Sequence, residues 1–189
     1  MSRRCLALCL ASLVIGACAS APIALLPKRT GAAPVQAAGS QALGLTALQN
    51  ATYRSPDWGE FQLVNGAYRR PPLATGESPD TYMTQMFGPI AYGDLNGDGL
   101  EDAAVFLTTQ SGGTGHFIEL AAVINSGGRA ENAATLPLGD RVGIEAARIE
   151  AGVITLDMRV HGPNDGLCCA SQFETRRFRL EAGELVRIP

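Results

Sequence analysis

The strongest constraint on how this chain can fold is a series of strand-like segments joined by very short turns. Residues 153–160 alternate apolar and polar side chains, and all four even-numbered positions of the segment are apolar, as in a strand with one buried face. The sequence Glu-Ala-Gly precedes this segment and recurs at residues 181–183 between two further strand-like segments. In each turn the glycine stands where a three-residue hairpin needs a positive φ. Because turns this short join antiparallel strands, the sequence predicts a mainly β chain folded as an antiparallel meander.

Other segments predict central strands and one helix. Residues 103–107 and 117–125 are apolar on both faces, as expected of central strands that are covered on both sides. Residues 43–51 have apolar residues at helical spacing and predict one short N-terminal helix. Residues 65–66, Asn-Gly, predict a hairpin with a type I′ turn. The pattern leaves open whether the meander forms a sandwich, a strongly curved sheet, or an open α+β sheet around the helix.

The most specific motif is an acidic loop that follows a strand-like segment. Within residues 94–102, Asp-Leu-Asn-Gly-Asp-Gly-Leu-Glu-Asp, oxygen-bearing side chains stand at positions 1, 3, 5 and 9. Calcium takes six to eight oxygen ligands, and a loop that offers an oxygen at every second position supplies them with little rearrangement. The two glycines permit the positive φ of a tight wrap. The predicted calcium ligands are Asp94, Asn96, Asp98, the backbone carbonyl of Leu100, and Asp102.

The flanks of the acidic loop restrict the class of calcium site. An EF-hand would carry a bidentate Glu at position 12, where this chain has Val105, so Asp102 would have to complete the coordination. The loop resembles the calcium loops of FG-GAP repeats and the first half of a dockerin loop, but residues 103–107 predict a strand where a dockerin has a helix. The motif occurs once, which argues against a propeller. A hairpin turn that binds no metal is the alternative, since Asn-Gly and Asp-Gly also favour plain turns.

The amino terminus has the order of a bacterial export signal. Arg3 and Arg4 precede an apolar segment, residues 5–17, which is too short to span a membrane. The segment runs into Ile-Gly-Ala-Cys, which resembles the lipobox in which the cysteine is lipidated before cleavage. We therefore predict a lipoprotein signal peptide over residues 1–17 and lipid attachment at Cys18. An ordinary secretory signal is the alternative.

The rest of the chain divides into a tether and one domain. Residues 18–41 are rich in Ala, Pro and Gly and predict a flexible tether with a span of about 25 Å, whereas residues 42–189 have the length of one ordinary domain. The chain has a formal net charge of −3 and no basic tract, so it lacks the electrostatic signature of nucleic-acid binding. Ala19 stands where an Asp would mark retention at the inner membrane. The predicted location is the outer membrane, facing the periplasm; the alternative is a secreted soluble protein.

A second loop, residues 161–169, holds the only cysteines that follow Cys18. Two adjacent thiols do not stay reduced in an oxidising compartment, which favours a disulfide between Cys168 and Cys169. A soft-metal site formed by both thiolates and His161 remains open. A Cys–His nucleophile pair also remains open, although no third orienting group is evident. Plain loop packing and a bridge to another chain are the remaining interpretations.

Four stretches of the chain together resemble an uncharacterised family of bacterial secreted or lipid-anchored proteins: residues 48–55, 93–105, 138–142 and 161–172. The resemblance covers most of the predicted domain, and the calcium loop is its specific motif. In that family a proline often follows the paired cysteines, where this chain has Ala170. The resemblance implies secretion or lipid anchoring and no particular activity.

These features favour a calcium-binding, mainly β domain that is tethered to the bacterial cell envelope and has a structural or partner-binding role. The expected partners are the membrane, through the lipid on Cys18, and an envelope protein or glycan. The alternative is a redox or hydrolytic enzyme that uses the Cys168–Cys169 loop with His161. The chain has only two histidines, so general acid–base chemistry near neutral pH has few candidates, and the binding role is favoured.

Overall fold

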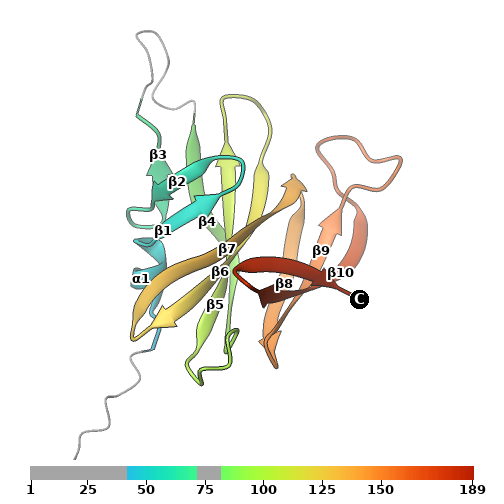
Figure 1. The fold of residues 1–189 in the computed structure, drawn as a ribbon. Coiled ribbons are helices and arrows are strands. Elements are labelled where there is room, and N and C mark those ends of the chain that lie inside the picture. Colours follow the sequence, from blue (N-terminus) through green and yellow to red (C-terminus); the bar gives the residue numbers. More distant parts are fainter. Residues whose placement is uncertain (1–41, 72–81) are drawn as a thin grey trace, which may run out of the picture. The chain divides into compact units, whose positions relative to one another are not determined.

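The chain folds mainly into antiparallel strands, as the alternating segments predict (Figure 1). The structure, a computed structural model, describes residues 42–71 and 82–189, and all of them belong to one unit of the chain, residues 38–189. The predicted signal peptide, Cys18 and the tether lie outside the described residues. In the described part, no helix has the length and apolar character needed to cross a membrane.

The described strands form three sheets. A five-stranded sheet has the order β3-β4-β5-β6-β7, a four-stranded sheet has the order β11-β10-β9-β8, and β1 pairs with β2. The elements are α1 (Leu45–Gln49), β1 (Thr52–Ser55), β2 (Gly59–Gln62), β3 (Ala67–Arg69), β4 (Met83–Gly93), β5 (Asp102–Gln110), β6 (Phe117–Ser126), β7 (Arg129–Asp140), β8 (Gly143–Glu150), β9 (Val153–Val160), β10 (Gln172–Glu181) and β11 (Glu184–Ile188). Neighbouring strands of both large sheets also follow one another in the chain, so the meander prediction is confirmed.

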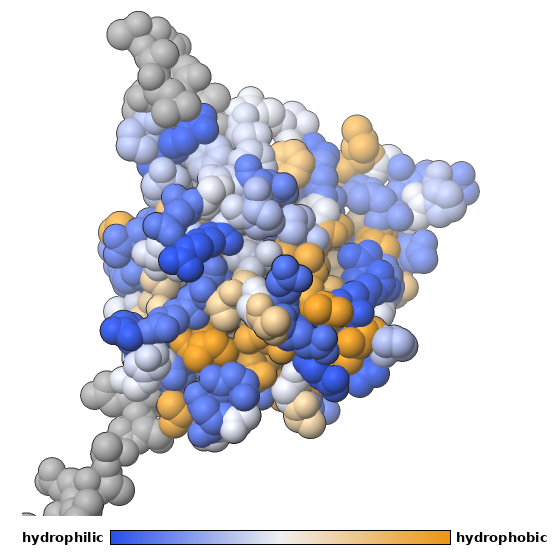
Figure 2. Space-filling view, viewed as in Figure 1, coloured by the Kyte–Doolittle hydropathy of each residue, from blue (hydrophilic) through white to orange (hydrophobic). Residues whose placement is uncertain are grey.

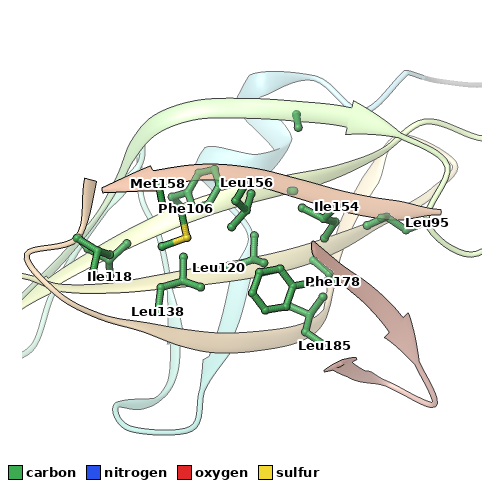
Figure 3. Packing of buried hydrophobic residues seen from close by; sticks show 14 of the residues in the cluster. Leu95, Phe106, Ile118, Leu120, Leu138, Ile154, Leu156, Met158, Phe178 and Leu185 are labelled. Atoms are coloured by element: carbon green, nitrogen blue, oxygen red, sulfur yellow. The ribbon is translucent and has the colours of Figure 1, made fainter. Parts of the chain in front are cut away.

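The two large sheets pack face to face and bury the main core between them. In Figure 3, Phe106 and Leu120 from the five-stranded sheet lie among Leu156 and Met158 of β9, with Phe178 of β10 beside them. Each fully buried side chain of this size contributes about 1.5–3 kcal/mol through removal of apolar surface from water. The arrangement found is therefore a strongly curled sheet that packs against a second sheet, and the open α+β alternative is not found.

Irregular pairing curls the sheets. Register shifts interrupt the pairing of β4 with β5, of β6 with β7 and of β8 with β9. Such bulges bend a strand and increase its twist. The curl brings β4 against β8 along one side of the sandwich and β7 against β11 along the other.

The second face of the five-stranded sheet is covered by α1 and the β1–β2 pair. Leu48, Tyr53 and Phe61 pack there against Val105 and Ala121 in a second core cluster. The strands β5 and β6 are thus buried on both faces, which confirms the prediction made from their sequences. The helix itself covers five residues and is shorter than predicted.

The glycine turns differ from prediction in their length. Glu150 pairs directly with Val153, and the same pattern joins β10 to β11, so each turn has two residues and not three. Ala151 and Ala182 take φ values of 50° and 49°, followed in both turns by a glycine with positive φ. This is the type I′ geometry that matches the twist of paired strands. The prediction of a three-residue turn was wrong because it assumed a positive φ only at the glycine, whereas the alanine before the glycine also has a positive φ.

Two further differences concern strand assignment. The Asn65–Gly66 turn has the predicted positive φ at both positions, 52° and 84°, but the strands on its two sides join different sheets. The longest strand, β7, was not predicted at all. Its sequence mixes small and polar residues without alternation, so no period marks it as a strand.

Candidate functional site

The acidic loop lies at the end of the sandwich where β4 passes into β5 (Figure 1, green). It also lies against the β8–β9 turn, because a Cβ added at Gly152 would lie 3.8 Å from the Leu95 carbonyl oxygen. Leu95 is buried in the main core and fixes the loop there. Gly93, just before the loop, lies so close to Ile149 of β8 that an added Cβ would be 2.7 Å from the Ile149 Cγ2 atom.

The predicted calcium ligands at positions 1, 3 and 5 bind the backbone of their own loop. The Gly97 and Gly99 N–H groups donate to the Asp94 carboxylate at 2.6 and 2.9 Å, and both glycines have a φ of 83°. The Asn96 amide oxygen accepts the Asp98 N–H at 2.9 Å, and the Asp98 carboxylate accepts the N–H of position 7 at 2.8 Å. The N–H groups of Gly99 and then Gly97 lower the pKa of the Asp94 carboxyl, because they stabilise its charged form.

The ligand predicted at position 9 has a different environment. Asp102 is fully buried, and each of its carboxylate oxygens accepts one backbone N–H at 2.8 Å, from Leu95 and from Asn125. Asn125 in turn donates to the Glu101 carbonyl at 3.1 Å and accepts the Gly128 N–H at 2.7 Å. Asp102 therefore joins the acidic loop to the β6–β7 turn.

The fit of this loop to calcium rests on its donor chemistry. The side chains of Asp94, Asn96 and Asp98 supply carboxylate and amide oxygens, which hard cations prefer, and each carboxylate oxygen that accepts one N–H retains a further lone pair. The side chains are not gathered into a ligating cluster. In the described residues, no three His, Cys, Asp or Glu side chains lie where they could hold a metal ion together. Calcium binding would thus require the side chains of Asp94, which is half-buried, and Asp98, which is exposed, to turn toward a common point.

A cavity of about 700 Å³ lies at the opposite end of the sandwich. The β5–β6 hairpin, the β7–β8 turn and the loop that follows β9 contribute its walls, and these connections lie away from the acidic loop in Figure 1. The lining residues are Phe87, Thr108, Thr114, His116, Ile118, Arg141, Val142, Gly143, Arg159, Cys168, Cys169 and Ala170. A volume of this size is within the usual range for small-molecule sites.

The loop between β9 and β10 is held in shape by one carboxylate. Asp165 accepts the N–H groups of Gly162 and Ser171, each at 2.8 Å, and the Ser171 hydroxyl donates to its other oxygen at 2.8 Å. These donors, Gly162 first, lower the pKa of the Asp165 carboxyl. The loop exposes Leu167, and Figure 2 shows hydrophobic atoms among hydrophilic ones in this region.

A disulfide bond joins Cys168 to Cys169 in this loop, in agreement with the pairing predicted from their adjacency. Both residues are exposed, and both line the cavity. While the bond is formed, neither sulfur is a thiolate that could attack a substrate or ligate a soft metal. The histidine beside the disulfide on the cavity wall is His116, whereas His161 does not line the cavity.

The cavity residues other than the cysteines were missed by sequence reasoning. His116 lies between β5 and β6, Arg141 lies between β7 and β8, and Arg159 lies in β9, so the three residues share no local sequence motif. The scarcity of histidine, two in 189 residues, was the only available signal for His116. Arg141 has a φ of 51°, a conformation that nothing in its sequence context predicts.

A third polar cluster lies inside the second core. The Ser55 hydroxyl donates to the Glu119 carboxylate at 2.6 Å, and Glu119 is only 1% exposed. Burial raises the pKa of the Glu119 carboxyl, because the charged form loses its hydration. The second oxygen of Glu119 is buried without a hydrogen-bond partner in the described part of the chain.

Comparison with known proteins gave no match: no family model, no curated protein and no solved structure matches the chain.

Proposed function

We propose that this protein is a calcium-binding lipoprotein of the bacterial cell envelope whose β domain has a structural or partner-binding role. The observation that carries the proposal is the fold of the acidic loop. Asp94, Asn96 and Asp98 each accept an N–H from their own loop, which keeps three oxygen-bearing side chains within five residues of one turn. The Asp94 and Asp98 charges repel each other at this spacing, and a cation between them would relieve the repulsion.

Calcium would act on folding in this proposal. The loop passes directly into β5, a strand buried on both faces, and Leu95 of the loop is part of the main core. Extracellular calcium modules have dissociation constants of roughly 10⁻⁴ to 10⁻³ M. At about 1 mM calcium, binding to the folded state alone would stabilise it by about 0.4–1.4 kcal/mol.

The proposal predicts a melting temperature that depends on calcium. Chelation should lower the melting temperature by a few degrees, about the shift expected from 1 kcal/mol in a domain of this size, and millimolar calcium should restore it. Magnesium should restore little, because it requires a tighter octahedral arrangement. Differential scanning calorimetry with and without each ion makes the measurement.

Matched variants separate calcium binding from loss of charge. Asp98→Ala should abolish the response to calcium while changing the chelated protein little, because Asp98 is exposed. Glu184→Ala removes the same charge from an exposed position in β11 and should leave the response intact. A melting temperature that does not move between micromolar and ten-millimolar calcium, together with no heat of binding, would leave the plain-turn interpretation.

Envelope anchoring is the second part of the proposal, and it depends on Cys18. Mass spectrometry of the membrane-extracted protein should show a diacylglycerol adduct on Cys18, and Cys18→Ser should release the protein from the membrane fraction. A soluble wild-type protein with an unmodified amino terminus after cleavage would contradict the anchor and support the secreted alternative.

A further inference from the structure

We propose that the cavity between the β5–β6 hairpin, the β7–β8 turn and the disulfide loop binds a small organic carboxylate with an apolar body. Nothing that lines this cavity belongs to the acidic loop, so the proposal does not depend on calcium binding. Its basis is the combination of guanidinium donors, apolar walls and a rim held by hydrogen bonds.

The donors of the lining residues favour an anion. Among the described residues, the ionisable side chains that line the cavity are His116, Arg141 and Arg159, with no carboxylate. Asp140 pairs with Arg141 and Glu145 pairs with Arg159, so the arginine charges are largely balanced. What favours an anionic ligand is the guanidinium N–H donors that these pairs leave over.

The arginines keep donors that the protein does not use. Arg159 donates its Nε–H to Glu145 at 2.5 Å, and its two terminal nitrogens donate no hydrogen bond within the described residues. Its side chain is 49% exposed. A guanidinium edge of this kind matches the two oxygens of a carboxylate.

Apolar groups form much of the remaining wall. Phe87, Ile118 and Val142 line the cavity and also contact or belong to the main core, so the cavity reaches from solvent to the edge of that core. The disulfide and Ala170 supply a further wall without a charge. An apolar ligand body would be removed from water against these groups, which favours an organic carboxylate over a small inorganic anion.

The rim of the cavity is braced by hydrogen bonds before any ligand arrives. The Asp140 carboxylate accepts the backbone N–H of His116 at 2.8 Å and an N–H of the Arg141 guanidinium at 2.5 Å. Arg141 also donates through its side chain to the Thr114 hydroxyl at 2.9 Å, and through its backbone N–H to the His116 carbonyl at 2.7 Å. Arg141 is held in a left-handed conformation by these contacts, and such strain persists where surrounding contacts enforce it. Fixed donors lower the ordering cost of binding.

The test uses 2-naphthoate as the probe, with 2-naphthamide as its neutral isostere and inorganic phosphate as the anion without an apolar body. Binding to the purified protein is followed by shifts of backbone amide resonances in two-dimensional NMR. Naphthoate should shift the amides of Gly143 and Ala170 at the cavity and leave those of Gly97 and Gly99 in the acidic loop unchanged. Naphthamide and phosphate should each bind more weakly.

Two arginine variants decide whether the charge acts where proposed. Arg159→Gln should weaken naphthoate binding about tenfold or more, as expected on losing a charge-assisted hydrogen-bonded pair. Arg148→Gln is the matched control: Arg148 bonds Asp157 across the same two strands, β8 and β9, but does not line the cavity, and its loss should leave the affinity unchanged.

Each result of these titrations either supports or contradicts the proposed carboxylate site. The proposal is supported if naphthoate binds at the cavity, prefers the wild type over Arg159→Gln and exceeds both other probes. It is overturned if millimolar naphthoate shifts no cavity amide, if the amide and the acid bind equally, if phosphate binds more tightly than naphthoate, or if Arg148→Gln loses as much affinity as Arg159→Gln. Repeating the titration with chelator should change nothing, so failure here is distinguishable from failure of the calcium proposal.

Discussion

The two ends of the sandwich use polar groups in opposite ways. At the acidic-loop end, polar side chains bond to the protein backbone: both oxygens of Asp102 accept backbone N–H groups. Packing is also close there, since Gly93 lies against Ile149. At the cavity end, Glu145 accepts the Nε–H of Arg159, and the terminal nitrogens of Arg159 donate no hydrogen bond within the described residues. The difference shows that backbone hydrogen bonds use the polar groups at one end of the fold, whereas at the other end part of a guanidinium stays available, which is the basis of the proposed binding site.

The largest expected effect concerns Asp102 at the acidic-loop end. Asp102→Ala leaves the Leu95 and Asn125 N–H groups buried without partners, at about 1–3 kcal/mol each, so the free energy of unfolding should fall by roughly 2–6 kcal/mol. Urea denaturation in chelator measures this without any contribution from calcium. Asp98→Ala in the same buffer is the control, since Asp98 is exposed. Equal stability of the two variants would contradict the difference between the two ends, because the hydrogen bonds of Asp102 would then contribute nothing to the free energy of unfolding.

Close packing gives the next effect. A Cβ at Gly93 would lie 2.7 Å from the Ile149 side chain and 3.0 Å from its carbonyl oxygen, whereas a Cβ at Gly113 in the β5–β6 hairpin meets nothing within 4 Å. Gly93→Ala should therefore destabilise the domain by about 1–3 kcal/mol through overpacking, and Gly113→Ala should be nearly neutral. Thermal melts of the two variants check the contrast, and a neutral Gly93→Ala would mean that β4 and β8 can separate freely there.

The disulfide should contribute less to global stability. Replacing Cys168 and Cys169 with serine opens a ring too small to constrain the unfolded chain strongly, so we expect a loss of less than about 1 kcal/mol. Thiol titration of the folded wild type, prepared without reductant, should find neither thiol reactive. Two reactive thiols would contradict the bond and revive the Cys–His and soft-metal interpretations.

The smallest effect is local and depends on pH. The folded pKa of Asp165 is lowered by the N–H groups and hydroxyl that it accepts, so its charge stabilises the loop at pH values above its unfolded pKa. That contribution is lost as the pH falls through the lowered folded pKa. Hydrogen exchange at the Gly162 and Ser171 amides should accelerate in Asp165→Asn near neutral pH, with little change at Gly97.

Wild-type protein should lose the same protection only on strong acidification. Exchange in the wild type that accelerates already at mildly acidic pH would contradict the lowered pKa. Because Asp94 has a lowered pKa for the same reason, its loop should respond to acid in parallel, and this is the one respect in which the two ends should behave alike.

Local sequence chemistry was enough to predict several elements. The alternation in β9, the apolar composition of β5 and β6, and the short glycine turns gave the antiparallel meander, since strand period and turn length depend on neighbouring residues. The adjacency of Cys168 and Cys169 predicted their disulfide. The left-handed alanines of the β8–β9 and β10–β11 turns were missed, because sheet pairing, and not residue preference, imposes that conformation.

By itself, then, the sequence determined that β5 and β6 are buried on both faces and that β9 alternates, and it placed an acidic, oxygen-rich loop between β4 and β5, but it did not mark β7 as a strand. Only the tertiary structure decided that the two sheets pack face to face, that Asp102 is buried and bonded to two backbone N–H groups, and that His116, Arg141 and Arg159 line one cavity together with the disulfide. The physical reason is how far apart in the sequence the interacting residues stand. Strand period and turn geometry arise between residues a few positions apart, whereas Asp102 reaches Asn125 and the cavity forms only after the curled sheets have packed.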